Sequence, residues 1–344
     1  MEENYLKIKL DLSNILKNFI NKENQYTIPI FIPHKGCPNN CIFCNQKRIS
    51  GQLKNVSIEE IDNIINEYLG YYDVHDKRIE IAFFGGSFTG IDITLQRQYL
   101  GVAKKYVDSR KVDSIRLSTR PDYIDEDILT MLKEYNVGTI ELGVQSMDEK
   151  VLNYAKRGHT ASDVIFASKL IKKYGIKLGH QIMIGLPNST LETELYTIRE
   201  CLKLGPTQLR IYPVYVIEDS ELYDMYNIKE YIPLSIEDAV KRCVAVIGEC
   251  QKTDVSIIRL GLQSTSEITS SNSNLFGPVC DNFAEYVMAK IIRDEIENKV
   301  NNFNDNIEVY VPSKYVSVTI GPKRINKIFF ENKYNIRYIV KGEN

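Results

Sequence analysis

Residues 28–51 read IPIFIPHKGCPNNCIFCNQKRISG, a short apolar strand followed by a loop that carries Cys37, Cys41 and Cys44 in the spacing CxxxCxxC. Deprotonated sulfur is a soft metal ligand, and the short spacing keeps the entropy cost of bringing the three ligands together small. A cubane cluster has four irons, so three cysteines leave one iron open for a small chelating molecule. The spacing therefore predicts a 4Fe-4S cluster with S-adenosylmethionine (SAM) as the chelating cofactor.

A structural zinc site is the main alternative, since His34 lies three residues before Cys37 and would complete a Cys3His set. The preceding apolar strand, the aromatic Phe43 within the cysteine loop and the long α/β pattern downstream favour the cluster. Cysteines that bind nothing are disfavoured, because three exposed thiols so close together would be prone to oxidation.

The pattern that follows is of short apolar runs alternating with helical segments, which is typical of strand-helix units around a parallel sheet. Six strands are predicted: Ile28–Pro33, Ile79–Phe84, Ser114–Thr119, Thr139–Val144, Ile176–Ile184 and Gln208–Tyr215. Most are almost continuously apolar, as expected for strands covered on both faces. Eight units would close a barrel, so the fold class predicted is α/β, a partial (β/α)6 TIM-like barrel with an open side through which substrate enters.

The rhythm changes after the sixth strand, where a helix from Ser235 and a short apolar segment, Ser256–Leu262, come before a polar loop. We expect an N-terminal extension over 1–25, the partial barrel over 26–278 and a small C-terminal α/β module over 279–344. Within that module the sequence predicts a helix near 280–299, followed by strands around Val309, at Tyr315–Ile320 and at Asn335–Val340.

Composition narrows the function classes. The 344 residues carry a formal net charge of −2 at pH 7, so any contact with nucleic acid must be local, and DNA is not an expected partner. No stretch approaches the roughly 18 apolar residues of a membrane span and the N-terminus lacks a leader pattern, which predicts a cytoplasmic protein without a membrane partner. Seven cysteines is an odd number, and Cys201, Cys243 and Cys250 fall in amphipathic runs, which favours packing over disulfides.

The cysteine loop, with Phe43 directly before Cys44, resembles the signature of the radical SAM superfamily. At the end of the second strand, FFGGSFTG resembles that superfamily's Gly-Gly-Glu motif, whose backbone receives the amino group of the methionine part of SAM. Gly85 and Gly86 match the motif, whereas Ser87 replaces the usual glutamate. The resemblance thus implies a backbone contact to SAM and no carboxylate contribution.

Four further strings, together within residues 26–225, resemble the radical domain of the Elongator catalytic subunit family: LSTRPDYID, TIELGVQSMDEKVLNYAKRGHT, HQIMIGLPNST and LRIYPVYV. The resemblance implies a six-unit partial barrel with SAM across the carboxyl ends of the strands. It also implies that Gln145 and Arg157 contact the ribose or carboxylate of SAM, with Ser118 and Arg120 as further candidates for the cofactor site. A reducing partner of the flavodoxin or ferredoxin type is implied as well.

Purely structural roles for these residues remain open. Gln145 would satisfy backbone groups at a strand end, and Arg157 would form a surface ion pair with Asp148 or Glu149. His159 is interpreted as a cap of the next helix rather than as a catalytic residue. Tyr212 and Tyr215, on the last strand, would orient substrate or simply pack.

Elongator catalytic subunits carry a long acetyltransferase domain after the barrel, and the roughly 65 residues here are too few for that fold, so the chain resembles the shorter bacterial relatives. From Lys314 to Asn344 there are seven Lys or Arg against two acids, with several aromatics, which favours local contact with RNA. The predicted function is reductive cleavage of SAM and hydrogen abstraction from a substrate, with a tRNA nucleoside as candidate. The alternatives are a radical enzyme for small molecules and a non-catalytic zinc- or cluster-bearing binding protein.

Overall fold

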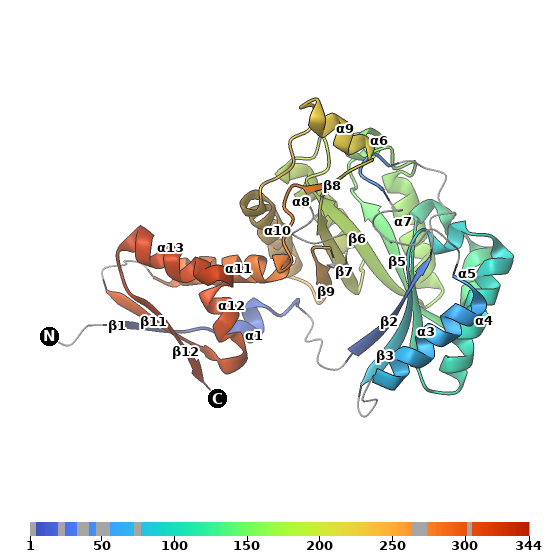
Figure 1. Cartoon of the computed structure of the whole chain (residues 1–344), viewed down its shortest axis with the longest axis horizontal. Helices are drawn as coiled ribbons and strands as arrows, with labels where there is room; N and C mark the ends of the chain where they lie inside the picture. The colour runs from blue at the N-terminus through green and yellow to red at the C-terminus, as the bar shows by residue number, and fades with distance from the viewer. Residues whose placement is uncertain are drawn as a thin grey trace.

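A seven-stranded parallel sheet dominates the computed structural model, which describes residues 5–19, 25–32, 41–45, 56–71, 77–262, 274–300 and 305–343. Its strands are β2 (Gln25–Ile32), β3 (Arg78–Gly85), β4 (Ser114–Thr119), β5 (Val137–Gln145), β6 (Lys177–Ile184), β7 (Gln208–Pro213) and β9 (Ser256–Leu260). Strand order in the sheet follows chain order, and β2 does not pair with β9. The sheet therefore curls into a half-barrel with one open side (Figure 1).

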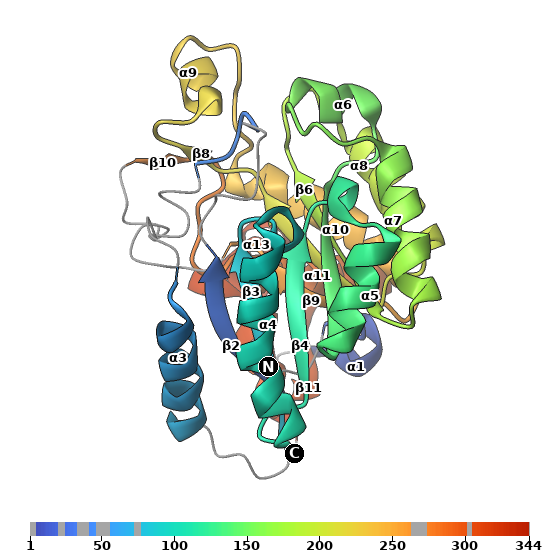
Figure 2. The ribbon, with the colours of Figure 1, turned by 90° about the vertical axis from the view of Figure 1, so that its right-hand side faces the viewer.

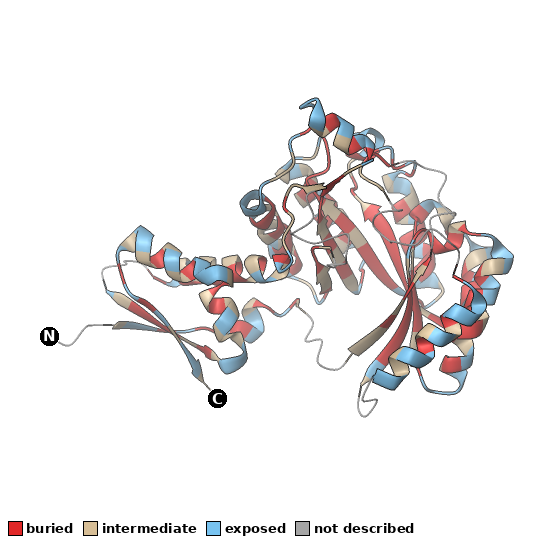
Figure 3. Ribbon diagram, viewed as in Figure 1, coloured by how far each residue is buried: buried red, intermediate tan, exposed pale blue. Residues whose placement is uncertain are grey.

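Helices cover the convex face of this sheet (Figure 2). They are α3 (Ile58–Tyr71), α4 (Ile93–Asp108), α5 (Glu126–Glu134), α7 (Ala161–Lys173), α8 (Leu191–Lys203) and α10 (Ile236–Cys250). Two shorter helices, α6 (Glu149–Tyr154) and α9 (Glu221–Asn227), lie instead above the carboxyl ends of the strands, at the top of Figure 1. The buried residues concentrate where helices meet strands (Figure 3), so the main core is the layer between them. No helix in the described ranges has both the length and the apolar character needed to cross a bilayer.

A smaller module lies beside the half-barrel, at the left of Figure 1. Three parallel strands form its sheet in the order β1 (Tyr5–Lys9), β11 (Asn306–Pro312) and β12 (Tyr338–Glu343). Helices α11 (Phe283–Lys299), α12 (Val316–Ile320) and α13 (Ile325–Tyr334) belong to the same module. The N-terminal segment thus contributes a strand to a sheet whose other two strands lie within residues 306–343.

Asn18 joins the N-terminal segment to the half-barrel. Its side-chain amide, buried, donates to the carbonyls of Cys250, Thr253 and Val255 at 3.2, 3.2 and 2.7 Å. The backbone carbonyl of Asn18 accepts a hydrogen bond from the backbone N–H of Ile257 at 2.6 Å. These bonds satisfy the turn between α10 and β9, so one asparagine fixes the start of the last barrel strand.

The six predicted strands are confirmed, and β9 adds a seventh that the sequence showed only as a short apolar segment. The predicted strand at Tyr315–Ile320 is wrong, because Val316–Ile320 forms α12. Thr319, fully buried, bonds through its hydroxyl to the Tyr315 carbonyl, and its own carbonyl accepts from Asn326 and Tyr338. These tertiary contacts outweigh the β-branched composition of the segment.

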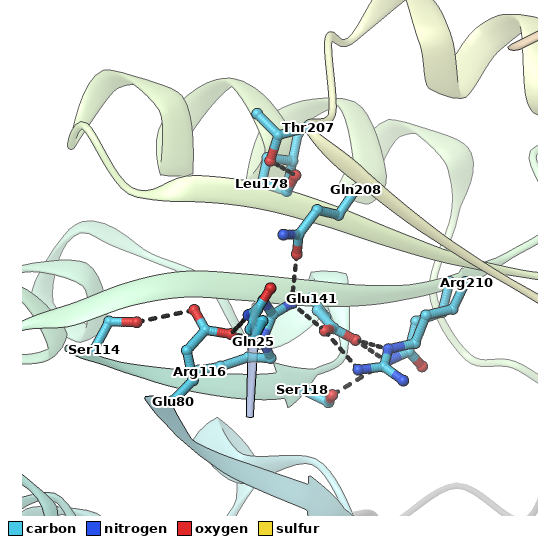
Figure 4. A network of polar contacts seen from close by, with 11 residues as sticks. Gln25, Glu80, Ser114, Arg116, Ser118, Glu141, Leu178, Thr207, Gln208 and Arg210 are labelled. Atoms are coloured by element: carbon cyan, nitrogen blue, oxygen red, sulfur yellow. Dashed lines mark hydrogen bonds and ion pairs between the residues drawn. The ribbon is translucent and has the colours of Figure 1, made fainter. Parts of the chain in front are cut away.

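Charged side chains from neighbouring strands form a buried network inside the half-barrel (Figure 4). Arg116, on β4, donates to Glu80 of β3 at 2.7 Å and to Glu141 of β5 at 2.6 Å. Arg210, on β7, donates two hydrogen bonds to Glu141, at 2.5 and 3.1 Å. Gly179, on β6, faces Glu141, and a Cβ atom on this glycine would lie 2.9 Å from the Glu141 side chain. Although burial alone would raise the pKa of Glu141, the charges of Arg210 and Arg116 lower it overall.

Neutral side chains complete this interior network, namely Gln25 and Ser114 at Glu80, Gln181 and Ser118 beside Glu141, and Gln208 at Arg116. The network spans strands β2 to β7, so it ties most of the sheet together from the inside. Such a buried ion cluster is stable only while every member keeps its partners.

We expect Glu141→Ala to lower the free energy of unfolding by about 3–5 kcal/mol, because it leaves Arg210 buried without a carboxylate. Urea unfolding followed by circular dichroism measures the change. Glu126→Ala is the control, since it breaks an exposed ion pair with Lys173 on the outer surface. Equal effects of the two substitutions would contradict a structural role for the interior network.

His180 lies inside the core, 1% exposed, with Nε2 at 2.9 Å from the Ser168 hydroxyl. Burial lowers its pKa from 6.5 to about 3. The folded protein therefore holds His180 neutral, while the unfolded chain takes up a proton as pH falls below about 6.5.

Stability should consequently fall as pH decreases from about 6.5 to about 3, with a slope from this residue that approaches about 1.4 kcal/mol per pH unit once the unfolded histidine is protonated. His180→Gln removes the titrating group and should flatten that slope by the same amount. Urea denaturation at a series of pH values tests this expectation. An unchanged slope in the variant would show that His180 does not carry the dependence.

Candidate functional site at the carboxyl ends of the strands

The carboxyl ends of the parallel strands meet at one edge of the half-barrel, where ligands bind in folds of this kind. The segment Cys41–Asn45 lies at this edge. Backbone bonds hold it: the Ile42 N–H donates to the Ala155 carbonyl at 3.3 Å, and the Ile42 carbonyl accepts from the Leu222 N–H at 2.8 Å. The ends of α6 and α9 therefore position the cysteine segment.

Cys41 and Cys44 share one turn, because the Cys44 N–H donates to the Cys41 carbonyl at 2.9 Å. Cys41 is 5% exposed, and Cys44 is half-buried. Cys37 and His34 lie outside the described residues, so the predicted third ligand and its zinc alternative are not placed. Among the residues that are described, no three His, Cys, Asp or Glu side chains gather to hold a metal ion.

Arg157 connects this turn to the sheet. Its guanidinium donates to the Cys41 sulfur at 3.1 Å and to the Gly143 carbonyl at 2.8 Å, and it lies 5.9 Å from the centre of the Phe43 ring. The residue is 7% exposed, which excludes the surface ion pair considered from the sequence. The structure thus brings Phe43, Cys41 and Arg157 together, as three of the predicted site residues.

Gln145 ends β5 with a positive φ of 63°, next to a register shift between β5 and β6. Its side-chain oxygen is buried and finds no hydrogen-bond partner among the described residues. A Cβ atom on Gly143 would lie 3.1 Å from the Gln145 amide nitrogen and 3.4 Å from the Arg157 guanidinium. The bare backbone of Gly143 therefore leaves room for the amide and the guanidinium side by side.

Gly85 and Gly86 bring the end of β3 against β2. The Gly86 N–H donates to the Ile32 carbonyl at 3.1 Å, and Gly85 has a φ of 99°. A Cβ atom on Gly85 would lie 2.7 Å from the same carbonyl, so only glycine fits without displacement. Ser87 points into the protein, where its hydroxyl lies 2.8 Å from that of Thr119 and accepts from the Arg120 N–H.

The remaining predicted residues lie at different depths. Arg120 forms two hydrogen bonds of 2.9 Å with Asp122 at the edge, whereas Ser118 faces the interior network and accepts from Gln181. Of the two tyrosines, Tyr215 is buried in a small apolar cluster with Ile217.

His159 is a member of the site that the sequence did not identify as functional. It is buried, with Nε2 at 3.2 Å from the Val144 carbonyl and with Nδ1 unpartnered in the described structure. Burial, together with the charges of Arg157 and Arg120, lowers its pKa to about 3. The helix cap assigned to it is made by Thr160 instead. A neutral imidazole next to two guanidinium groups therefore borders the strand ends.

These groups suit a ligand with mixed polarity. Thiols are ligands for iron, an unpartnered amide oxygen accepts hydrogen bonds from hydroxyls, and a guanidinium binds carboxylates. The donors of Cys41, Cys44, Arg157 and Gln145 therefore fit a cluster with SAM.

The basic C-terminal segment, Lys314–Asn344, has fewer side chains available for contact with RNA than its composition suggested. Lys333 and Lys341 form ion pairs with Glu297 and Glu308. Phe330 is fully buried and stacks on Tyr338, with ring centres 4.8 Å apart. The two lysines and the two rings thus stabilise the small module, and the buried Phe330 and Tyr338 are not available to stack on bases.

Comparisons with known proteins agree with the geometry. A model of the radical SAM superfamily matches residues 31–201, and a model of the radical SAM C-terminal domain matches residues 206–293. The tRNA uridine(34) acetyltransferase of Methanocaldococcus jannaschii is 32% identical over 184 residues, which cover 48% of this chain and 34% of that protein. Elongator complex protein 3 of Dictyostelium discoideum is 31% identical over 194 residues, which cover 50% of this chain and 35% of that protein.

The chain thus spans about a third of the length of these two relatives. Among solved structures, Elp3 of Methanocaldococcus infernus matches with a TM-score of 0.60 and 22% identity, covering 87% of this chain and 68% of that one. That likeness concerns the fold. With the matched domains and the resemblance of its motifs, the chain belongs to the radical SAM superfamily, as an enzyme whose radical domain is of the Elongator type.

Proposed function

We propose that this radical SAM enzyme holds a 4Fe-4S cluster on Cys37, Cys41 and Cys44 and cleaves SAM to abstract a hydrogen atom from a tRNA nucleoside. When reduced by one electron from a flavodoxin-like or ferredoxin-like donor, such a cluster splits a carbon–sulfur bond of SAM into methionine and an adenosyl fragment, which takes a hydrogen atom from a substrate carbon and ends as 5′-deoxyadenosine.

The observation that supports this proposal most strongly is the contact between Arg157 and Cys41 beside the unpartnered oxygen of Gln145. Buried polar atoms are normally hydrogen-bonded, so the Gln145 oxygen indicates a missing ligand group. We assign it to the ribose hydroxyls of SAM, and Arg157 to the carboxylate. The Gly85–Gly86 backbone would receive the amino group through its carbonyls.

The proposed contribution of the protein is positioning. Gly143 allows Gln145 and Arg157 to stand side by side, and the α6 and α9 termini fix the cysteine turn. A preorganised site of this kind lowers the entropy cost of bringing the cofactor and the substrate carbon together. Phe43 and the buried Ile42 help to exclude water from this edge.

The substrate is assigned from relatives, since those with the name tRNA uridine(34) acetyltransferase and Elongator complex protein 3 share this domain. The alternative within the class is a radical enzyme that acts on a small molecule. The two are distinguished by whether tRNA increases 5′-deoxyadenosine formation.

We expect anaerobically reconstituted protein to hold about four irons per chain, as one cubane requires, and to form 5′-deoxyadenosine with SAM and reductant. Cys44→Ala should lose the iron, because it removes one of three thiolates. Cys250→Ala is the control, since Cys250 is fully buried in α10 far along the chain. Total tRNA should increase 5′-deoxyadenosine formation. Stoichiometric zinc in place of iron would refute the cluster, and a tRNA-independent rate would refute the RNA substrate.

We also expect Arg157→Met and Gln145→Ala to weaken SAM binding by about tenfold or more, because each removes a hydrogen bond to a charged or buried ligand group. Equilibrium dialysis with labelled SAM measures the affinity, and the iron content should persist. Arg199→Met removes an exposed guanidinium paired with Glu249 and serves as the control. Unchanged affinity in both site variants would show that these residues do not contact SAM.

A further inference from the structure

A cavity of about 310 Å³ lies inside the half-barrel, on the inner face of the sheet toward its open side. The first strand, β2, and the last strand, β9, both line it. Three aromatic side chains, Phe31, Phe84 and Tyr68, form one part of the wall, and three guanidinium groups, Arg116, Arg210 and Arg259, form another. The cavity is thus both aromatic and cationic.

The charges in this interior do not balance. Glu80 and Glu141 offset Arg116 and Arg210, with which they form ion pairs. Arg259, on β9, makes no ion pair with an acidic side chain among the described residues. Burial, the largest cause, lowers the pKa of Arg259; Tyr212 opposes this and the charge of Arg210 adds to it, so the pKa is lowered overall. A partly desolvated guanidinium without a counter-charge is costly, so its presence at a cavity indicates that an anion completes the site.

The aromatic wall lies directly beside these cations. The Arg210 guanidinium is 4.9 Å from the centre of the Phe84 ring, and the centres of Phe31 and Phe84 are 6.5 Å apart. Flat rings next to guanidinium groups suit a ligand that combines a planar ring with an anionic group. A nucleotide has both, because its base stacks on aromatic side chains and its phosphate pairs with arginine.

We propose that this cavity is the substrate subsite of the enzyme and holds a single nucleotide, with its phosphate on Arg259 and Arg210 and its base against Phe31 and Phe84. The assignment rests on the function proposed above and names the part of the substrate that the barrel recognises. A volume near 310 Å³ is at the lower end of the range for ligand sites, about 300–1,000 Å³, so it admits one nucleotide and not a duplex. The phosphate would come from a free mononucleotide or from a nucleotide turned out of an RNA loop.

The test is direct binding to the anaerobically reconstituted protein with SAM and without reductant. Isothermal titration with uridine 5′-monophosphate and with uridine isolates the contribution of the phosphate. We expect the monophosphate to bind about tenfold more tightly, as for a charge-assisted hydrogen bond. Arg259→Gln should abolish this preference, and Arg259→Lys should keep part of it because the charge remains.

Two further variants protect the interpretation. Arg97→Gln removes an exposed guanidinium from the outer helix α4 and should leave both affinities and 5′-deoxyadenosine formation unchanged. Phe31→Leu should weaken both ligands alike and leave the phosphate preference intact. A preference that survives in Arg259→Gln, or that is absent from the wild-type protein, would overturn the subsite. Tighter binding of orotate, a uracil carboxylate, would overturn the nucleotide assignment.

The source of the phosphate follows from competition. Displacement of the bound monophosphate by a single-stranded RNA containing uridine identifies RNA, and displacement only by mononucleotides identifies a free nucleotide. The same experiments distinguish a failure of the proposed function from a failure of the subsite. A protein that binds the monophosphate but forms no 5′-deoxyadenosine contradicts the SAM chemistry and keeps the subsite, whereas one that cleaves SAM without any phosphate preference contradicts the subsite alone.

Discussion

Glu141 receives hydrogen bonds from two guanidinium groups and one amide at the centre of the half-barrel, and the architecture depends on this cluster. A barrel that stays open cannot fill its interior with layers of apolar side chains, as closed barrels do. The ion cluster ties β3, β4, β5 and β7 together from the inside while it leaves a polar cavity. The same constraint makes the charge of Arg259 conspicuous, because every other guanidinium in the network has a carboxylate partner.

Strand β5 links the interior to the proposed cofactor site. Glu141, Gly143 and Gln145 occupy every second position of this strand, so they lie on its inner face. The four residues from Glu141 to Gln145 span roughly 13 Å. One end of this strand face holds the ion cluster and the other holds the unpartnered amide oxygen. β5 does not itself line the cavity, but Glu141 pairs with Arg116 and Arg210, which do. The strand therefore connects the cavity wall to the proposed cofactor site through one rigid element, which favours precise positioning of a substrate carbon.

The sequence allowed the strands and the cysteine turn to be predicted because both are local signals, an apolar run and a fixed spacing. β9 was not counted as a strand, since five residues that include Arg259 carry no clear alternation. The helix at Val316–Ile320 depends on distant partners of Thr319, which no local pattern encodes. The interior cluster did leave a signal, a polar residue at every second position of β7, Gln208, Arg210 and Tyr212, within an otherwise apolar strand.

The pairing of β1 with β11 and the bonds of Asn18 also bear on how the chain folds during synthesis. Tyr5–Lys9 finds its partner strand about 300 residues later, and Asn18 caps a turn that begins at Cys250. The small sheet cannot form until β11 and β12 have left the ribosome, and the strand Tyr5–Lys9 must remain unpaired until then. A nascent chain therefore presents an open strand edge, charged at Lys7 and Lys9, whose lysines discourage pairing with other chains.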